Sequence, residues 1–407
     1  MKPVVKGTHY EKVVCACCFL FLCVNVGFPS TSFNVYQPYI VEIPGVGDTG
    51  GSMVLACRTL VSLLCMLVVG KWYGFFDCRK GVFIATCLTA LGFLLYGFAD
   101  SFWSLCLGAV FAGAGYGLGG MVCMTLIIGR WFKSHVGAAV GIAATGSGFA
   151  SIVFPFVITA IIENLGLHYA FFMQTVVALA IGLLVHALLR NYPSDLGMKP
   201  YESPEKEGKK EKRIGAACSL TPAAHNVMFV AMVFMGCIAV GGWSYLSILM
   251  TSSGFDAYFA ATLLTVAGLG LAVAKSVSGE VFDLVGPAKG SAIFFVLLNL
   301  GLFLCSLAFL RIEPLMAAGI AIMSVGNCLG TVGISVWAID LSTIDERVKL
   351  VKNLQVAYAL GGFLFSIIPG PLADLTGSYS ISFAILTAVG IACMVMVLGI
   401  YHRLVKR

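Results

Sequence analysis

Long apolar runs, separated by short charged loops, follow one another along almost the whole of this chain. Of its 407 residues, 59% are hydrophobic and only 11% are charged, and the mean hydropathy is +0.97. A soluble domain is roughly 45–50% apolar and about 25% charged, so this composition excludes an ordinary soluble enzyme. Because a run of about 20 apolar residues is long enough to cross a bilayer as a helix, we expect an all-α membrane protein.

The apolar runs predict twelve transmembrane helices. Their ranges are Val13–Tyr39, Gly50–Phe75, Gly81–Ala99, Phe102–Gly129, Gly137–Ile162, Ala170–Leu189, Asn226–Met250, Tyr258–Phe282, Lys289–Phe309, Pro314–Ile339, Leu350–Ala373 and Ile381–Tyr401. The first run is too long for the apolar region of a secretory signal peptide and lacks a small-residue cleavage site. We therefore interpret it as a membrane span.

Basic residues gather on alternate loops, which predicts the orientation of the chain. One side holds Arg79, Lys80, Arg130, Lys133, Arg190, Lys199, the run Lys206–Arg213, Lys289, Arg347, Lys349, Arg403, Lys406 and Arg407. The other side holds mainly acidic residues, namely Glu42, Asp48, Asp100, Asp256, Glu313 and Asp374, with Arg311 as the exception. Basic loops remain in the cytoplasm, so both termini should be cytoplasmic in a plasma-membrane protein. The net charge of +6 follows this topology and is not a nucleic-acid signal.

The only long hydrophilic stretch is 191–224, which carries both signs of charge and few large apolar residues. Such a composition is typical of a solvated linker, either a plain connector or a regulatory segment. It divides the chain into an N-terminal six-helix bundle (1–190), a cytoplasmic linker (191–224) and a C-terminal six-helix bundle (225–407).

The two halves share a motif at one constant offset. Gly70 follows the second span and Gly279 the eighth (279 − 70 = 209), and the pairs Lys80/Lys289 and Gly81/Gly290 have the same spacing. Matches at corresponding places indicate a duplication, as in transporters built from repeats. We therefore expect two pseudo-symmetric halves.

Two cations lie deep within apolar runs: Arg58 in the second span and Lys275 in the eighth. A charge at mid-bilayer costs at least about 2.5–3.5 kcal/mol and usually faces a bundle interior, where it has a partner. Since neither span has an acidic residue equally deep, we expect an anionic solute to be that partner. The alternatives are that Lys275 extends to the cytoplasm and that Arg58 binds carbonyls of a broken helix.

Other polar and aromatic residues are candidates for the same solute site. They are Asn34, Tyr36 and Gln37 in the first span, Trp337 in the tenth and Tyr358 in the eleventh. Amide, hydroxyl and indole groups orient polar ligands, although helix packing explains each of them as well.

No residue pattern predicts catalysis, a metal site or a bound cofactor. The 15 cysteines have neither metal-ligand nor disulfide spacing, and most are expected to be small buried hydrophobes. Palmitoylation near Cys15–Cys18 is an alternative for that group. The glycines of Gly113–Met121 lie in mid-membrane, where close helix packing accounts for them.

The loops after the second and eighth spans resemble the GxxxDxxGxxKG signature loop of the major facilitator superfamily. The C-terminal copy is complete, with Gly279, Asp283, Gly286 and Lys289. The N-terminal copy contains Gly70, Asp77, Arg79 and Lys80. In this copy Gly74 stands at the Asp position of the motif, and Asp77 stands at the Gly position. The resemblance implies a gating latch in which the Asp accepts bonds from a helix N-terminus.

The segment GRWFKSHVGAAVGIAATGSGFAS, which contains Arg130, is similar to the oxalate/formate antiporter and monocarboxylate porter branch of that superfamily. The resemblance implies that Lys275 occupies the position of a substrate-binding cation. Branch members that carry oxalate also have a lysine in helix 11. Residues 354–373 contain none, which argues against oxalate.

The combined interpretation is a secondary active transporter of a small organic anion, expected to be a monocarboxylate. It would work by alternating access, as an antiporter or a proton symporter, with protons or a counter-anion as coupling partner. We expect a monomer in the lipid bilayer, with no enzymatic activity. The rival interpretations are a transporter of another solute, such as a drug or amino acid, and a membrane sensor on a transporter fold.

Overall fold

The computed structural model describes residues 10–133, 136–202, 221–342 and 344–405. Within these residues the regular structure is helical, apart from one isolated backbone bridge between Phe132 and Tyr201. The basic run Lys206–Arg213 and most of the predicted linker lie outside the described residues.

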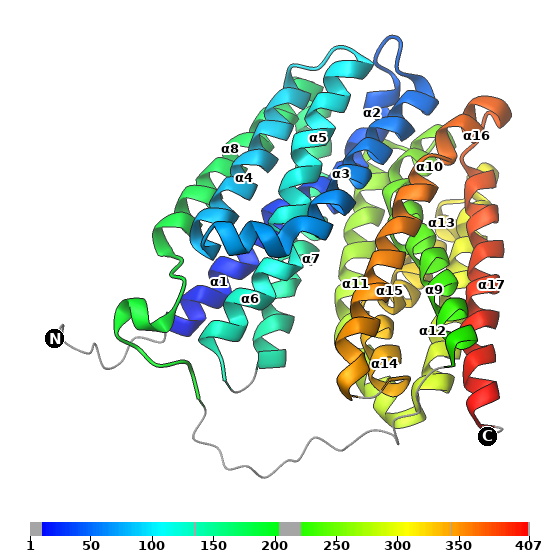
Figure 1. Cartoon of the computed structure of the whole chain (residues 1–407). Coiled ribbons are helices and arrows are strands. Elements are labelled where there is room, and N and C mark those ends of the chain that lie inside the picture. Colours follow the sequence, from blue (N-terminus) through cyan, green and yellow to red (C-terminus); the bar gives the residue numbers. More distant parts are fainter. Residues whose placement is uncertain (1–9, 134–135, 203–220, 343, 406–407) are drawn as a thin grey trace. The chain divides into compact units, whose positions relative to one another are not determined.

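Twelve helical stretches in the described chain are long and apolar enough to cross a membrane, which confirms the predicted all-α fold and its twelve spans. The first six are formed by α1 (Tyr10–Leu22) with η1 (Cys23–Ser32), η2 (Phe33–Tyr36) and α2 (Gln37–Val41), then α3 (Gly47–Phe75), α4 (Cys78–Gly97), α5 (Phe102–Leu118) with α6 (Met121–Trp131), α7 (Val136–Leu165) and α8 (Leu167–Leu188). The short η3 (Pro193–Leu196) follows α8 (Figure 1).

The last six spans continue the same pattern. They are formed by α9 (Pro222–Gly236) with η4 (Cys237–Gly242), which α10 (Leu246–Ser252) extends, then α11 (Ala257–Val285), α12 (Pro287–Ser306), α13 (Glu313–Gly326) with η6 (Asn327–Gly330) and α14 (Val332–Asp340), α15 (Ile344–Ser366) with α16 (Pro369–Thr376), and α17 (Ser380–Val405). The short η5 (Ala308–Leu310) precedes α13.

The chain forms two compact units. Unit 1 contains Met1–Tyr39, Ile43–Gly45 and Cys57–Lys206, and unit 2 contains Ile40–Glu42, Val46–Ala56 and Glu207–Arg407. The start of α3 therefore packs with the C-terminal helices, where the Tyr379 hydroxyl donates a 2.8 Å hydrogen bond to Asp48 Oδ1. Burial beside this carboxylate raises the pKa of the Tyr379 hydroxyl, so it remains a donor at physiological pH.

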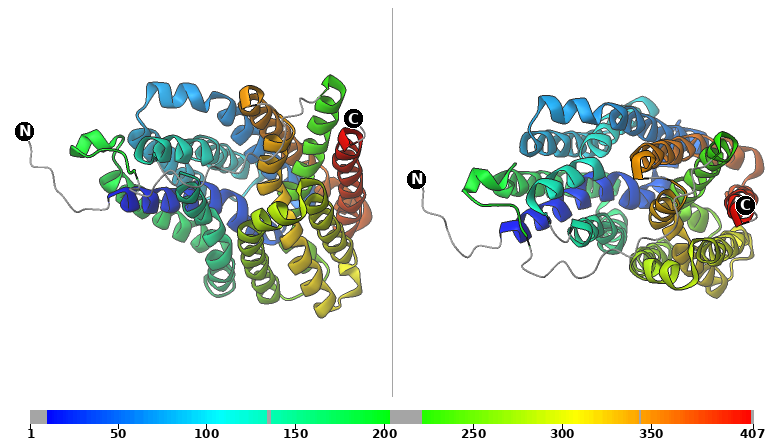
Figure 2. Two further views of the ribbon diagram at one scale, coloured as in Figure 1. Left: turned by 90° about the horizontal axis from the view of Figure 1, so that it is seen from below. Right: turned by 60° about the horizontal axis from the view of Figure 1, so that its bottom comes forward.

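Equivalent helices pack in the same pairs in each unit. In unit 1, α4 contacts α5 and α8, and α1 contacts α7. In unit 2, α12 contacts α13 and α17, and α9 contacts α15. Figure 2 shows these helices from two further directions. Because the pairing repeats in chain order, the structure agrees with the duplication expected from the signature loops.

The duplication extends to close contacts made by glycines. A Cβ on Gly81 would lie 2.5 Å from the Tyr73 ring, and one on Gly290 would lie 2.6 Å from the Phe282 ring. The repeat offset of 209 residues relates Gly290 to Gly81 (290 − 81 = 209) and Phe282 to Tyr73 (282 − 73 = 209). At each position only a glycine lets the next helix start against the aromatic ring of the preceding helix.

Several spans that the sequence predicts as continuous helices are broken. The first and seventh spans contain the π-helical segments η1 and η4, and the fourth and tenth are interrupted at Gly119–Gly120 and at η6. Pro29 contributes to the irregularity of η1 because proline lacks the backbone N–H of a regular helix. Breaks at membrane depth need other partners for the freed backbone groups.

Asn25 supplies such partners in unit 1. Its Nδ2 donates to Thr86 Oγ1 at 3.0 Å and approaches the Gly119 carbonyl at 3.5 Å, while Thr89 Oγ1 donates to its Oδ1 at 3.0 Å. The fully buried amide thus connects η1, α4 and the break between α5 and α6. This is a structural role, and it accounts for a polar residue in the middle of the first span.

Candidate functional site

Lys275 is the predicted site cation of unit 2. It lies in α11, ten residues before the helix ends at Val285 (285 − 275 = 10), and is half-buried. Among the described residues no hydrogen bond or ion pair of its amine is found. Its charge acts instead on the thiol of Cys328 in η6, and α11 packs directly against η6.

Lys275 therefore lies beside η6, where the tenth span is broken. Thr331 has a non-helical backbone (φ −126°, ψ −62°), and its N–H reaches only back to the Cys328 carbonyl at 3.1 Å. The Oδ1 atom of Asn327 is buried without a hydrogen-bond partner within the described chain. Broken helices with free polar groups are typical of solute sites in transporters.

Tyr358 reaches the same break from α15. Its hydroxyl lies 3.1 Å from the position that a Cβ on Gly330 would occupy, at the end of η6. The structure thus brings two predicted site residues, Lys275 and Tyr358, to one element of unit 2, together with Asn327 and Cys328. A cation, a hydroxyl and an amide around a helix break can bind a carboxylate by charge and by hydrogen bonds.

Arg58 lies in a different environment, within the packing of unit 1. It is 5% exposed, and its Cζ is 5.3 Å from the centre of the Phe33 ring. The guanidinium also acts electrostatically on the phenols of Tyr96 and Tyr116. A cation over an aromatic face is stabilised by about 0.5–2 kcal/mol. The protein itself therefore stabilises part of the Arg58 charge, for which the sequence analysis expected an anionic solute.

The two cations are not equivalent in the repeat. The counterpart of Arg58 at the 209-residue offset is Ala267, eight residues before Lys275 (275 − 267 = 8). At 1.5 Å per residue this difference is about 12 Å along the helix. Arg58 is nearer the start of α3, and Lys275 is nearer the end of α11.

The predicted polar residues of the first span are all buried. The Tyr36 hydroxyl donates to Gln174 Oε1 at 2.9 Å, and its ring stacks on Phe171 with centroids 4.1 Å apart. Asn34 and Gln37 are each 1% exposed. Neither polar atom of the Gln37 amide has a hydrogen-bond partner in the described chain. Sequence reasoning missed Gln174, because a single glutamine in the sixth span carries no pattern.

Trp337 is packed rather than open. Its Nε1 donates to Ser291 Oγ at 2.8 Å, its ring stacks on Phe295, and it is fully buried in unit 2. This placement favours the packing interpretation that the sequence left open.

The predicted gating residues of the N-terminal half are anchored within unit 1. Asp77 caps α4 by accepting from the Lys80 N–H at 2.8 Å, and Arg79 Nε donates to the His186 carbonyl at 2.7 Å. Arg130 lies over the Tyr192 ring at 4.5 Å. The capping role that the motif implies is thus performed by Asp77 on its own helix.

The C-terminal copy is more open. Asp283 is exposed, and within the described residues neither Asp283 nor Lys289 has a hydrogen bond or an ion pair. Gly286 has a positive φ of 85° at the turn between α11 and α12, which glycine adopts without strain. Around Gly70 and Gly279 a Cβ would meet nothing within 4 Å, so these two glycines mediate no close packing inside their units.

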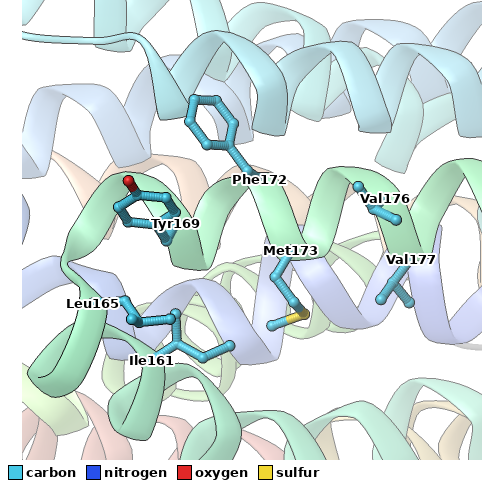
Figure 3. Close-up of a pocket in the computed structure, with 7 residues that line it drawn as sticks. All are labelled: Ile161, Leu165, Tyr169, Phe172, Met173, Val176 and Val177. Carbon is cyan, nitrogen blue, oxygen red and sulfur yellow. The ribbon is translucent and has the colours of Figure 1, made fainter.

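A surface pocket lies apart from all these residues. It has a volume of about 390 Å³ and is formed by residues of α7 and α8, namely Ile161, Leu165, Tyr169, Phe172, Met173, Val176 and Val177 (Figure 3). Its lining is apolar except for the tyrosine hydroxyl. A pocket without charge on two membrane-spanning helices does not fit a small anion.

The fold and the polar break define a class of protein. Twelve membrane-spanning helices in two repeated units, with broken helices beside a lysine that has no partner among the described residues, are the architecture of a secondary transporter. In the described residues there is no cluster of His, Cys, Asp or Glu suited to a metal ion.

The chain belongs to the Major Facilitator Superfamily, whose profile matches residues 17–312. The family consists of transporters, not enzymes. Relatives include monocarboxylate transporter 13 of Bos taurus, 26% identical over 76% of this chain and 70% of that protein. Monocarboxylate transporter 11 of Homo sapiens is 26% identical over 82% of this chain and 70% of its own length.

Solved structures support the fold. The nucleoside transporter NupG matches with a TM-score of 0.77 at 11% identity, over 97% of this chain and 100% of that chain. A D-xylose–proton symporter matches with a TM-score of 0.68 at 13% identity, over 95% of this chain and 96% of that chain. At such identities the likeness concerns the architecture alone.

Proposed function

We propose that this major facilitator protein carries a small organic anion, and that the anion is a monocarboxylate. The observation that carries the proposal is Lys275, a half-buried cation beside the η6 break with no acidic partner in the described chain. Two relatives over most of the chain are monocarboxylate transporters, which supports the same solute class.

In the proposed site the solute carboxylate pairs with the Lys275 amine, and Tyr358 and Asn327 donate or accept hydrogen bonds at the helix break. Pairing neutralises the cation, so the loaded carrier occludes it at a smaller desolvation cost than the empty carrier. The conformational change of the empty carrier is then disfavoured. This favours exchange of anions or co-transport with protons over an uncoupled leak.

Uptake by purified protein in liposomes tests the solute class. Labelled lactate, pyruvate and acetate should accumulate faster than in empty liposomes, and either an inward proton gradient or an internal counter-anion should stimulate uptake. Lactamide, which lacks the carboxylate, is the matched neutral control and should not compete. Competition by lactamide equal to that of lactate would contradict an anion site and favour another solute. Ligand binding without flux would favour a membrane sensor.

The orientation is proposed from the loop charges. Both termini and the linker should be cytoplasmic in the plasma membrane, because the basic residues collect on that side. An epitope tag after Arg407 should be stained in permeabilised cells and not in intact cells. A second tag inserted after Gly254, on the opposite side of the seventh span, should be stained in intact cells. Staining of the C-terminal tag in intact cells would reverse the topology.

A further inference from the structure

The start of α3 lacks the cap that the equivalent helix, α11, supplies from its own chain. The Asp256 carboxylate, just before α11, accepts the backbone N–H groups of Tyr258 at 2.8 Å and Phe259 at 3.1 Å. The repeat offset places Gly47 at the position of Asp256 (256 − 209 = 47) and Thr49 at that of Tyr258 (258 − 209 = 49). Gly47 has a positive φ of 62° and no side chain that could accept a hydrogen bond from α3.

A carboxylate from another helix takes the role of this cap. Asp374 of α16 accepts a hydrogen bond from the Thr49 backbone N–H at 3.1 Å and a second one from the Thr49 hydroxyl. The first N–H groups of a helix have no partner within the helix, so α16 satisfies a donor that α3 cannot satisfy by itself. Asp374 lies 325 residues further along the chain, and the local sequence therefore gives no sign of this cap.

Further contacts hold the same turns of α3 within unit 2. The Tyr379 hydroxyl donates to Asp48 Oδ1 at 2.8 Å, and the hydroxyl of Tyr245, which precedes α10, lies 2.9 Å from Ser52 Oγ. Gly370 of α16 allows a close approach, since a Cβ at this position would overlap the Asp48 carbonyl and the Ser52 hydroxyl. We call the residues that hold the start of α3 the α3 clasp: Asp374, Tyr379, Tyr245 and Gly370.

The clasped segment is itself a poor helix former. Residues 45–52 include Gly45, Gly47, Gly50 and Gly51, and only proline has a lower helix propensity than glycine. Most of the stability of a helical segment in a protein comes from packing against its neighbours rather than from propensity. With neither a cap of its own nor favourable residues, the segment 47–52 depends on the α3 clasp for its helical structure.

The clasp lies close to the place where α3 passes from one unit to the other. Residues Val46–Ala56 belong to unit 2, whereas α3 from Cys57 onward belongs to unit 1. A movement of one unit against the other must then bend α3 at this point or pull its first turns off α16. Asp374 is exposed, so water can replace Thr49 at its carboxylate when the contact opens.

We propose that residues 47–52 are a docking-dependent segment, helical while the α3 clasp holds them and unwound when the clasp opens. Opening separates the start of α3 from α16 and leaves the part of α3 in unit 1 helical. Ordering and unwinding of a short segment is a recurrent element of conformational switches. The proposal concerns the conformation of the protein and does not depend on which solute it carries.

Hydrogen–deuterium exchange of the full-length protein in lipid nanodiscs tests the proposal, with mass spectrometry of peptides that cover residues 45–56 and 254–266. Asp374→Ala should accelerate exchange of the amides of residues 48–52 by roughly 2- to 30-fold, the range expected for the loss of a helix cap. Tyr379→Phe keeps the aromatic ring and removes only the hydroxyl, so it should fold normally and accelerate the same amides to a smaller extent.

The matched control is Asp256→Ala, which removes an exposed capping carboxylate from α11 in the same unit. It should accelerate exchange of residues 257–260 and leave residues 48–52 unchanged. Acceleration confined to residues 48–52 in the two clasp variants supports the proposal.

Wild-type exchange of residues 48–52 in both Asp374→Ala and Tyr379→Phe would overturn the proposal, because α3 would then begin as a helix without the clasp. Equal acceleration of these residues in Asp256→Ala would overturn it as well. The same holds for acceleration that extends to peptides of α12 and α17, since the substitution would then have lowered the stability of unit 2 as a whole.

Discussion

Replacing Lys275 by glutamine is expected to weaken the binding of a carboxylate solute by about 10- to 150-fold. A charge-assisted hydrogen bond contributes about 1.5–3 kcal/mol more than no bond, which corresponds to that range of dissociation constants. Lys275→Arg should retain part of the affinity, because the charge remains while its geometry changes. Concentration-dependent uptake or competition by unlabelled lactate in liposomes measures the effect.

The matched control is Lys352→Gln, an exposed lysine near the start of α15 in the same unit. It removes the same charge away from the η6 break and should leave the affinity unchanged. Both variants should insert and fold, since removal of an intramembrane charge relieves its insertion cost. A well-folded Lys275→Gln protein with wild-type affinity for its carboxylate would leave Arg58 as the remaining candidate cation.

Substitution of Gly361 by alanine should strongly destabilise the packing of α15 against α9. A Cβ at this position in α15 would lie 1.8 Å from the Val233 carbonyl oxygen of α9 and 3.0 Å from the Cys237 nitrogen. Both are backbone atoms that cannot rotate away. Overpacking of this kind costs about 1–3 kcal/mol or more, or roughly 2–12 °C in apparent melting temperature for a unit of this size.

The control is Gly399→Ala in α17, also in unit 2, where a Cβ would meet nothing within 4 Å. Alanine is the better helix former by about 1 kcal/mol, so this variant should be unchanged or slightly more stable. Thermal unfolding of detergent-purified protein, followed by thiol-reactive fluorescence or by size-exclusion after heating, measures both. If the two variants melted at the same temperature, the close approach of α9 and α15 would be wrong.

Much of the architecture could be predicted because its causes are local. The length and hydropathy of each apolar run determine a membrane-spanning helix, and the twelve predicted runs correspond to the twelve spans of the structure. The offset of 209 residues between Gly70 and Gly279 indicates the duplication without any knowledge of contacts. The breaks in η1 and η6 were not predicted, although Pro29 is a local signal for the irregularity of η1.

In the candidate site, too, some features follow from the local sequence and others only from the packing of helices. Sequence alone identified Lys275 and Arg58, because a charge within an apolar run is visible without a fold. Only the tertiary structure placed Lys275 beside the η6 break with Tyr358, and Arg58 on the Phe33 ring. Tyr36 proved to bond with Gln174, a residue that no sequence pattern singles out.

The number of spans, the repeat and the presence of two cations within apolar runs could therefore be inferred from the amino-acid order. Which buried polar groups have partners within the described chain follows from the packing of the helices. Hydropathy and helical periodicity act within one segment of chain, whereas a hydrogen bond between side chains depends on how separate helices pack.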